Sequence, residues 1–600
     1  MNSQPVLSQK RLGVALRLAG GLAGLACLTL GQGLLLDSRL PFAPLLLYAV
    51  GTALLLPLLN HGAKYPARES HEGGLIEFLP ARDRGLYAAG ALFFGVIGGL
   101  AAQLGRPSLL LVAMWLLCTL ATLALFVRVR LHVSEKALGR FWPEALALAA
   151  LPFVLALLLR ATYAPEIGLV EHYARAEAIA ALQSGQTPAQ YPASPFLLTL
   201  ETMAAGRTLE MADFVRVSAA AALALVALVS MLGAALAGRW AGLAGAALAA
   251  SSGWTLALAK AGTEHALLAL CAALYLLALW AADGAERRKT YSTGLWALVG
   301  VCLGQGWLIS PDFGWLALLL PARAALHLLD ERPLWWKNAL QTLRRLYGWR
   351  GMQRALVWFA TPLLLPAVLL DAWRRAQRGL PGMVVAALLA LIVLLPFVLL
   401  APDFGWLPQA HVATDYEARS GQPPLYASLD SLASSALLFY LTRDPSPLHG
   451  LLNRPALLPL VTALLTAGLL LWALRWTQRD TRGDGDQQAA RVEKGRTLLP
   501  LLALAMCLLP GALRLEVPAS APDVLAAGLA LPLVFVLVGM GAAALAGHLR
   551  ALLGRLGMLL ALLLLAGGVL WSALDAQRHY NDVALPAYEQ SAQVYEQTLP

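Results

Sequence analysis

The stretch MVVAALLALIVLLPFVLL at residues 383–400 carries no charge, and LLPLVTALLTAGLLLWAL at 457–474 and MLLALLLLAGGVLWSA at 558–573 share its character. Each is about as long as an α-helix needs to be to cross a bilayer core of roughly 30 Å. The 600-residue chain is 59% hydrophobic and 13% charged, with a mean hydropathy of +0.65. These values predict an all-α polytopic membrane protein. The runs do not alternate with a period of two, which argues against a barrel.

Apolar segments of this kind recur and predict about fifteen membrane crossings. They are expected at residues 17–36, 41–59, 86–103, 108–127, 143–161, 213–237, 239–258, 264–282, 293–310, 314–329, 381–401, 455–475, 498–513, 523–547 and 556–574. With the N-terminus in the cytoplasm, the dense Lys and Arg clusters fall on one side, as the positive-inside rule requires. The C-terminus is then outside. Residues 330–380 hold an apolar stretch between two basic clusters and are predicted to form a cytoplasmic amphipathic segment.

The net charge of +10 does not indicate nucleic-acid binding, because the basic residues are spread over many short loops. No Gly-rich phosphate loop or nucleophile elbow is recognisable, which argues against ATP-driven pumps and serine hydrolases. The cysteines lie inside apolar runs, without a metal-like spacing or a disulfide pattern. They are Cys27, Cys118, Cys271, Cys302 and Cys507. Neither a metal site nor a cofactor is predicted, and whether a divalent cation assists stays open.

With this topology, the long outer segments are 162–212, 402–454 and the tail 575–600. The first outer loop contains GLVEHYARAEAIAAL at 168–182, which predicts interfacial helices. Glu171 and Arg175 are four residues apart and therefore share a helix face. A carboxylate held at the membrane edge can take the proton of an acceptor hydroxyl, which makes Glu171 a candidate general base. A solvated interfacial helix with i,i+4 ion pairs is the structural alternative.

Two other outer segments carry polar residues. The turn LAKAGTEH at 258–265 contains Lys260 and Glu264, and a lysine beside the start of a helix offers an anion site. The alternative is a lysine whose stem covers apolar surface while its ammonium reaches water. The segment LTRDPSPLHGLLNRP at 441–455 holds Arg443 and His449 in a stiff loop with Pro and Gly. It is equally explained as a polar turn before the next helix.

The order of these features resembles that of bacterial membrane glycosyltransferases of the GT-C superfamily. The chain is most similar to glycosyltransferase family 39, which includes the protein O-mannosyltransferases. The likeness covers residues 143–600 and rests on GLVEHYARAEAIAAL, on RVSAAAALALVALVSMLGAALAGRWAGLAGAALAASSGW and on LTRDPSPLHGLLNRPALLPL. It implies a GT-C-like bundle of about eleven core transmembrane helices, preceded in residues 1–142 by about four additional ones.

The resemblance also implies an active site at the outer membrane face, a polyprenyl-phosphate sugar as donor and a protein, lipid or glycan hydroxyl as acceptor. The family's first outer loop carries an adjacent Asp-Glu pair, which matches Val170-Glu171-His172 here. Either Glu171 replaces the Asp and His172 the Glu, or Glu171 keeps its place and Val170 replaces the Asp. Glu171 and His172 are then the catalytic candidates. The candidates for contacting the donor phosphate are Lys260 and Arg443, with Arg175, Glu264 and His449 as further site residues.

These observations predict a glycosyltransferase of the hexosyltransferase type in a bacterial cytoplasmic membrane, in contact with membrane lipid. The incomplete acidic pair leaves a second reading open, a catalytically silent relative that binds a lipid-linked sugar or acts as a scaffold. A transporter or flippase is a third alternative. It is disfavoured because few ionisable residues lie in the middle of the predicted helices and no inverted repeat is evident.

Overall fold

The structure, a computed structural model, describes part of the chain. The described residues are 16, 19–30, 46–47, 49–54, 76–77, 128–129, 150–162, 211–287, 293–330, 382–394, 398, 411–412, 423–440, 451, 454–477, 494–515, 524–587 and 589–590. All but the first residue of the predicted cytoplasmic segment 330–380 and most of the first outer loop lie outside these ranges. Most of the described residues lie from residue 211 onward.

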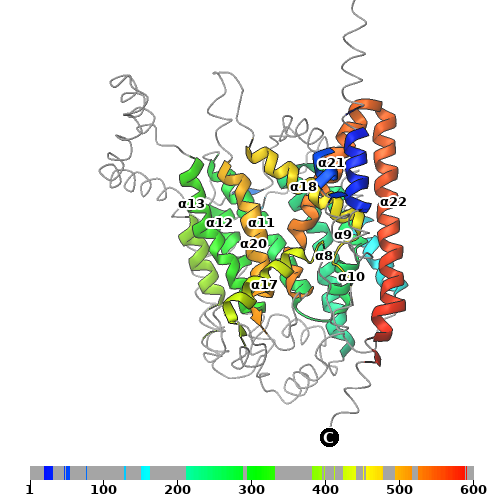
Figure 1. Ribbon diagram of the computed structural model, residues 1–600. Coiled ribbons are helices and arrows are strands. Elements are labelled where there is room, and N and C mark those ends of the chain that lie inside the picture. The colour runs from blue at the N-terminus through cyan, green and yellow to red at the C-terminus, as the bar shows by residue number, and fades with distance from the viewer. Residues whose placement is uncertain are drawn as a thin grey trace, which may run out of the picture.

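Long helices dominate the described residues (Figure 1). They are α8 (Met211–Ala237), α9 (Arg239–Ala250), α10 (Gly253–Lys260), α11 (His265–Arg287), α12 (Thr293–Ile309), α13 (Leu319–Asp330), α17 (Pro424–Leu437), α18 (Pro459–Thr477), α20 (Lys494–Ala512), α21 (Leu531–Leu553) and α22 (Arg555–His579). Two 3-10 helices, η2 (Pro311–Leu318) and η4 (Ala526–Ala530), and one π-helix, η5 (Tyr580–Ala584), adjoin them. Shorter apolar helices span Ala19–Leu30, Ala150–Ala161 and Gly382–Leu394.

Described helices lie at the positions of the crossings predicted after residue 212, and four or five of them are long and apolar enough to span a membrane. Some differ in form from the expectation. The crossing expected at 314–329 begins as the 3-10 helix η2 and continues as α13. The expected crossing at 239–258 is two helices, α9 and α10, bent by 59° at a short break. The last helix, expected to end near residue 574, continues through η5 to residue 587. The bent helix pair and this extension contact each other, since Lys260 at the end of α10 lies over the Tyr580 ring in η5.

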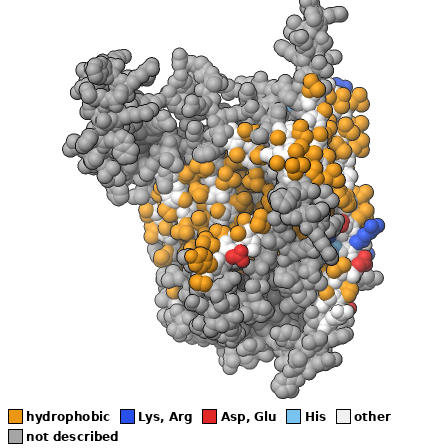
Figure 2. Space-filling model, viewed as in Figure 1, with side chains coloured by type: hydrophobic (Ala, Val, Ile, Leu, Met, Phe, Trp, Pro, Cys, Tyr) orange, Lys and Arg blue, Asp and Glu red, His pale blue; other side chains and the backbone are white. Residues whose placement is uncertain are grey.

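Four described helices are long and apolar enough to cross a membrane: Phe214–Ala237, His265–Glu286, Ala526–Leu553 and Arg555–Ala587. A fifth crossing results if the bent pair α9 and α10 counts as one span. The described part of the surface in Figure 2 is accordingly covered mainly by hydrophobic side chains. The chain is a multi-pass membrane protein, and which end of the bundle faces the cytoplasm stays a prediction.

Two short strand pairs connect loops. β1 (Ile76–Glu77) pairs antiparallel with β2 (Arg128–Val129), and β3 (His411–Val412) pairs parallel with β4 (Arg514–Leu515). In the predicted topology, β1 and β2 both belong to cytoplasmic loops, whereas β3 and β4 both belong to outer ones. Each pair therefore joins segments that the charge pattern assigns to the same side.

The centre of the bundle is α21, which packs closely against α9 on one side and α18 on the other. Glycines make this approach possible. A Cβ added at Gly539 of α21 would overlap the carbonyl oxygen of Ala241 in α9, and one added at Gly245 would overlap that of Phe535. A Cβ at Gly468 of α18 would likewise overlap the carbonyl oxygen of Leu537. Small residues at such contacts are typical of membrane helices, whose association depends on close packing.

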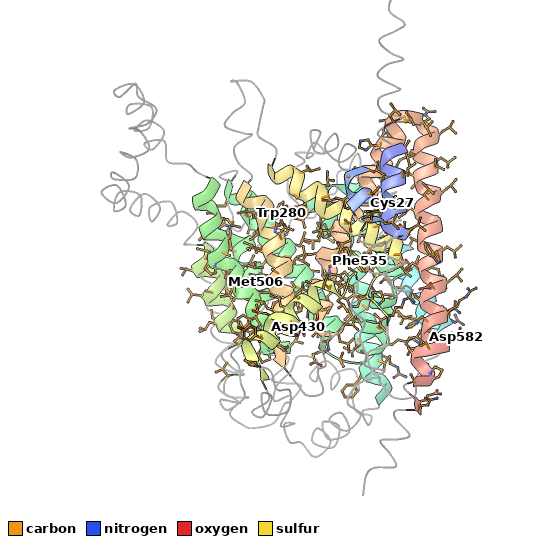
Figure 3. All side chains as sticks on the ribbon, viewed as in Figure 1. Cys27, Trp280, Asp430, Met506, Phe535 and Asp582 are labelled. Atoms are coloured by element: carbon orange, nitrogen blue, oxygen red, sulfur yellow. The ribbon has the colours of Figure 1, made fainter. Side chains whose placement is uncertain are left out.

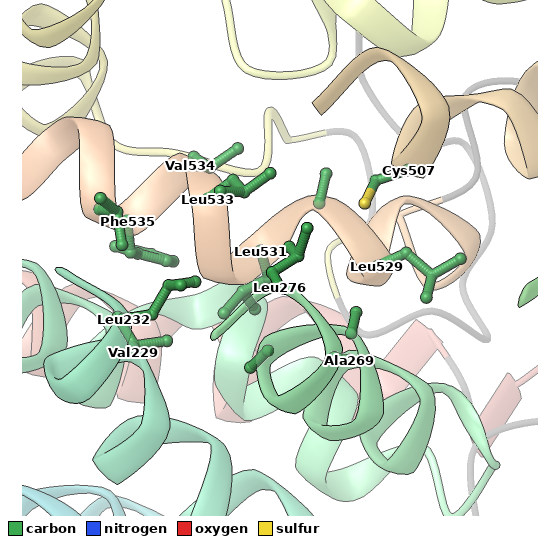
Figure 4. Close-up of a cluster of buried hydrophobic side chains, with 14 of the residues drawn as sticks. Val229, Leu232, Ala269, Leu276, Cys507, Leu529, Leu531, Leu533, Val534 and Phe535 are labelled. Atoms are coloured by element: carbon green, nitrogen blue, oxygen red, sulfur yellow. The ribbon is translucent and has the colours of Figure 1, made fainter. Parts of the chain in front are cut away.

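Around this contact lies a continuous apolar core. Figure 4 shows α21 and the turn before it facing α8 and α11, with the thiol of α20 close by. The labelled side chains are Val229, Leu232, Ala269, Leu276, Cys507, Leu529, Leu531, Leu533, Val534 and Phe535. Cys271, Cys302 and Cys507 are buried as free thiols, as their positions in apolar runs predict. Cys118 lies outside the described residues.

A buried ionic cluster joins α11 to α13. The Arg323 Nε atom donates to Asp283 Oδ1 at 2.9 Å, and its Nη2 atom pairs with Glu286. The guanidinium also lies over the Trp296 ring of α12, 4.6 Å from the ring centroid. Asp283 follows the start of α11 by about five turns, or about 27 Å of helix at 1.5 Å per residue. This cluster therefore holds the opposite end of α11 from the turn that carries Lys260.

The glycine contacts lead to a stability prediction. Gly539→Ala inserts a methyl group between α21 and α9 and should destabilise the fold by about 1–3 kcal/mol, the usual cost of overpacking. Gly567→Ala in α22 is the matched control, because nothing lies within 4 Å of its Cβ position. Melting temperatures of both variants in the same detergent should show a drop for Gly539→Ala alone. Equal melting of the two variants would contradict the close contact.

Candidate functional site

The break between α9 and α10 determines where Lys260 points. Ser252 caps α10, because its side-chain oxygen accepts a hydrogen bond from the Trp254 amide at 3.1 Å. Across the break, Ser572 Oγ of α22 donates to the carbonyl oxygen of Ser251 at 3.0 Å. Trp254 Nε1 donates to the Val524 carbonyl oxygen at 2.8 Å. Exposed backbone groups at a helix break need such partners, and these three contacts direct α10 along the last turns of α22.

Lys260 is the last residue of α10, and its side chain is only 2% exposed. Its Nζ atom donates to the Thr162 carbonyl oxygen at 3.0 Å and lies 4.5 Å from the centroid of the Tyr580 ring. A positive charge near the end of a helix is favourable, and the face of an aromatic ring attracts a cation. The prediction placed this lysine beside the start of α11. Instead, its ammonium turns toward α22 and the residue at which the first outer loop begins.

The turn after Lys260 leads tightly into α11. Gly262 has φ 63°, a left-handed conformation that favours glycine. Ser218 Oγ of α8 donates to the Thr263 carbonyl oxygen at 2.7 Å, which ties the turn to a second helix. Glu264, a predicted site residue, is half-buried in this turn, and its carbonyl oxygen accepts from the Leu268 amide at 2.8 Å. The turn after Lys260 is thus fixed by a hydrogen bond from α8 and by one from the first turn of α11.

Arg454 meets the same part of α22 from another direction. It closes the predicted outer loop 402–454, and its guanidinium pairs with Asp575 of α22. Both side chains are partly exposed, 19% for Arg454 and 34% for Asp575. The helix Ala150–Ala161 contacts α22 through its C-terminal end, where Gln577 Nε2 donates to the Ala161 carbonyl oxygen at 3.2 Å. A small apolar cluster fills this junction. Its buried members are Leu158, Leu256, Ala576, Tyr580, Ala584 and Leu585.

The last turns of α22 are therefore a junction of three segments that are far apart in sequence. In Figure 3, the label at Asp582 marks this end of the helix. One segment leads into the first outer loop at Thr162, one is the Lys260 turn and one is the end of the loop 402–454. These three segments adjoin the outer segments in which the sequence predicts the catalytic and phosphate-binding residues. We name the group formed by Thr162, Lys260, Tyr580, Arg454 and Asp575 the α22 junction.

Of the predicted site residues, the structure describes Lys260 and Glu264. Glu171, His172, Arg175, Arg443 and His449 lie outside the described residues. Their convergence with Lys260 therefore stays a prediction, although Thr162 and Arg454, which flank their loops, both lie at the α22 junction. Within the described part of the chain, no group of three or more His, Cys, Asp or Glu side chains is arranged to hold a metal ion.

The residues that α22 contributes were not predicted, because the apolar run of the last crossing ends near residue 574. Asp575 and His579 are four apart, as are Ala576 and Tyr580, so each pair shares a face of the extended helix. This spacing of four residues was the sequence signal that could have predicted the longer helix. The Lys260 ammonium over Tyr580, the Arg454 guanidinium paired with Asp575 and the His579 imidazole all meet residues 575–580, and such a group is suited to binding an anion such as a phosphate ester.

Comparison with known proteins adds one finding. No family model and no curated protein matches the chain. Among solved structures, the chain is similar to the oligosaccharyltransferase of Archaeoglobus fulgidus, crystallised with a tethered acceptor peptide, with a TM-score of 0.40 and 14% sequence identity. The match covers 74% of this chain and 56% of that one, so the chain spans little more than half of that protein's length. A similarity at this TM-score supports no inference about activity.

The Lys260–Tyr580 contact can be tested on its own. Tyr580→Leu removes the ring from the ammonium and should cost about 1–2 kcal/mol of stability, whereas Tyr580→Phe keeps the ring and most of that energy. Without the ring, Lys260 should also react faster with an amine-modifying reagent, measured by mass spectrometry of the peptide that contains it. Labelling of Lys260 in Tyr580→Leu at the parental rate would show that the ring does not shield the ammonium.

Proposed function

We propose that the protein is a membrane glycosyltransferase that moves a sugar from a polyprenyl-phosphate donor to a hydroxyl of a protein, lipid or glycan at the outer membrane face. The observation that supports this most directly is the contact between Lys260 Nζ and the Thr162 carbonyl oxygen. It brings a buried cation to the residue at which the loop with the acidic motif begins. The reaction class is taken from the resemblance of the sequence to glycosyltransferase family 39, whose features occur here in the same order.

In the proposed reaction, Glu171 accepts the proton of the acceptor hydroxyl, with His172 beside it. The acceptor oxygen then forms a bond to the anomeric carbon, while the bond between that carbon and the phosphate oxygen breaks. The electron pair stays on the phosphate, which leaves as polyprenyl phosphate. Lys260, with Arg443 as a second candidate, stabilises the charge that develops on this leaving group.

The described geometry implies one rearrangement in this proposal. Lys260 is covered by the Tyr580 ring and bonded to the Thr162 carbonyl oxygen. A phosphate oxygen that binds Lys260 would take the place of that carbonyl, since an ammonium bonds an anionic oxygen more strongly than a neutral carbonyl oxygen. Donor binding would then release the start of the first outer loop. The lipid chain would lie against the apolar surface of α22, where Leu559, Leu563 and Trp571 are exposed.

A second candidate function is a catalytically silent protein that binds a lipid-linked sugar. The motif Val170-Glu171-His172 favours it, because one member of the family's acidic pair is missing. Binding and turnover must therefore be measured separately. A binding protein needs the cation at the α22 junction but not a base in the first outer loop.

The test uses the purified full chain in lipid nanodiscs with a panel of polyprenyl-phosphate sugars. Glu171→Gln should lower transfer by about 10²–10⁴-fold, the usual contribution of a general base, and leave donor binding close to parental. Lys260→Met should weaken donor binding by about tenfold or more, because methionine is similar in length to lysine but lacks its charged hydrogen-bond donor. Arg555→Gln, at the exposed opposite end of α22, is the control for loss of one positive charge.

The outcomes separate the readings. Equal transfer by the parent and Glu171→Gln removes Glu171 from the mechanism. Donor binding by the parent without transfer to any acceptor favours the silent relative. No binding of any polyprenyl-phosphate sugar by the parent rejects both proposals.

A further inference from the structure

The His579 side chain lies next to the α22 junction and has no role in the proposed reaction. His579 follows Asp575 by one helical turn on the same face of α22, and Asp575 pairs with Arg454. His579 Nε2 is buried and has no hydrogen-bond partner among the described residues. A buried polar atom without such a bond lowers stability, so native proteins satisfy nearly all of them with protein, water or ligand. The His579 imidazole is therefore ready to accept a ligand.

The position of His579 indicates which ligand. Tyr580 follows it directly in the chain, and the Tyr580 ring lies 4.5 Å from Lys260 Nζ. Arg454 contacts Asp575 and Lys260 lies over Tyr580, so both cations meet the segment 575–580 that carries His579. The helix changes there from α to the π-helical η5, Tyr580–Ala584. Single π-helical turns inside α-helices occur often at functional sites, because they re-aim the side chains on either side.

We propose that His579 and Arg454 bind the phosphate group of a lipid phosphate together with Lys260, which rests on the function proposed above. An imidazole with its proton on Nε2 donates one hydrogen bond to a phosphate oxygen. A guanidinium carries five N–H donors, so Arg454 has the capacity to serve both Asp575 and a phosphate. This assigns the second cation of the site to Arg454 instead of Arg443.

Asp575 then has an opposing effect. Its carboxylate pairs with Arg454 and repels a phosphate at the same place. If Asp575 had a purely structural role, loss of its ion pair with Arg454 would weaken the α22 junction and any binding there. In the proposed role, loss of the carboxylate frees Arg454 and removes a repulsion, so the phosphate binds more tightly. The direction of the effect distinguishes the two roles.

The experiment titrates sugar-free polyprenyl phosphate into the purified full chain in nanodiscs, with inorganic phosphate as a second probe. His579→Leu should weaken binding by about tenfold or more, and His579→Gln, whose amide also donates, should recover most of that loss. Asp575→Asn should tighten binding by about three- to tenfold. Arg578→Gln is the matched control on the same turn, because Arg578 is exposed, and it should bind like the parent.

Melting temperatures of all variants show whether each one folds, and a variant that melts like the parent but binds as predicted supports the assignment. Parental affinity in both His579→Leu and Asp575→Asn, while Lys260→Met loses binding, overturns the role of His579 and Arg454 and leaves the proposed function intact. No binding by the parent overturns the proposed function itself. Equal binding of inorganic phosphate and polyprenyl phosphate identifies a general anion site instead of one for a lipid phosphate.

Discussion

The arrangement at the α22 junction depends on one buried charge. Transfer of an ammonium from water into an apolar environment is costly unless polar partners surround it. The Lys260 ammonium meets this requirement with the Thr162 carbonyl oxygen and the face of Tyr580. Each partner belongs to a different segment, so the charge holds the helix Ala150–Ala161, α10 and α22 together. Moving any one of the three would leave the ammonium without part of its environment.

The same contact between Lys260 and Tyr580 helps to fix the position of the C-terminal end of α22. Along most of its length its side chains are exposed, as Leu556, Leu563 and Leu570 are, which suits a helix at the edge of a membrane bundle. Its last turns and η5 carry buried side chains that contact several other segments, among them Ser572, Ala576 and Tyr580. In Figure 1, α22 forms the right-hand edge of the molecule, with α10 beside its lower half. The helix is therefore fixed at the end where polar groups gather.

The centre and the junction are built differently. At the centre, α21 contacts α9 and α18 through glycines, and backbone approaches this close leave little room for change. At the junction, partly exposed ionic groups and a bent helix pair replace that packing. Interactions of this kind can be exchanged for those of a ligand at small cost. A rigid bundle with adaptable polar contacts at one end is a suitable scaffold for binding and releasing an anion.

The sequence by itself determined the membrane class and the helix positions after residue 212, because a bilayer demands long apolar segments whatever their neighbours are. It also identified Lys260, since a charged residue within an apolar membrane segment is energetically costly and usually has a functional role. Hydropathy could not show the break at Ser251 and Ser252, where Ser252 caps α10 and Ser572, more than 300 residues later in the chain, donates a hydrogen bond to the Ser251 carbonyl oxygen. Nor could it show that Tyr580 and Asp575 meet Lys260 and Arg454. Contacts between distant segments depend on how helices pack, and only the tertiary structure decided them.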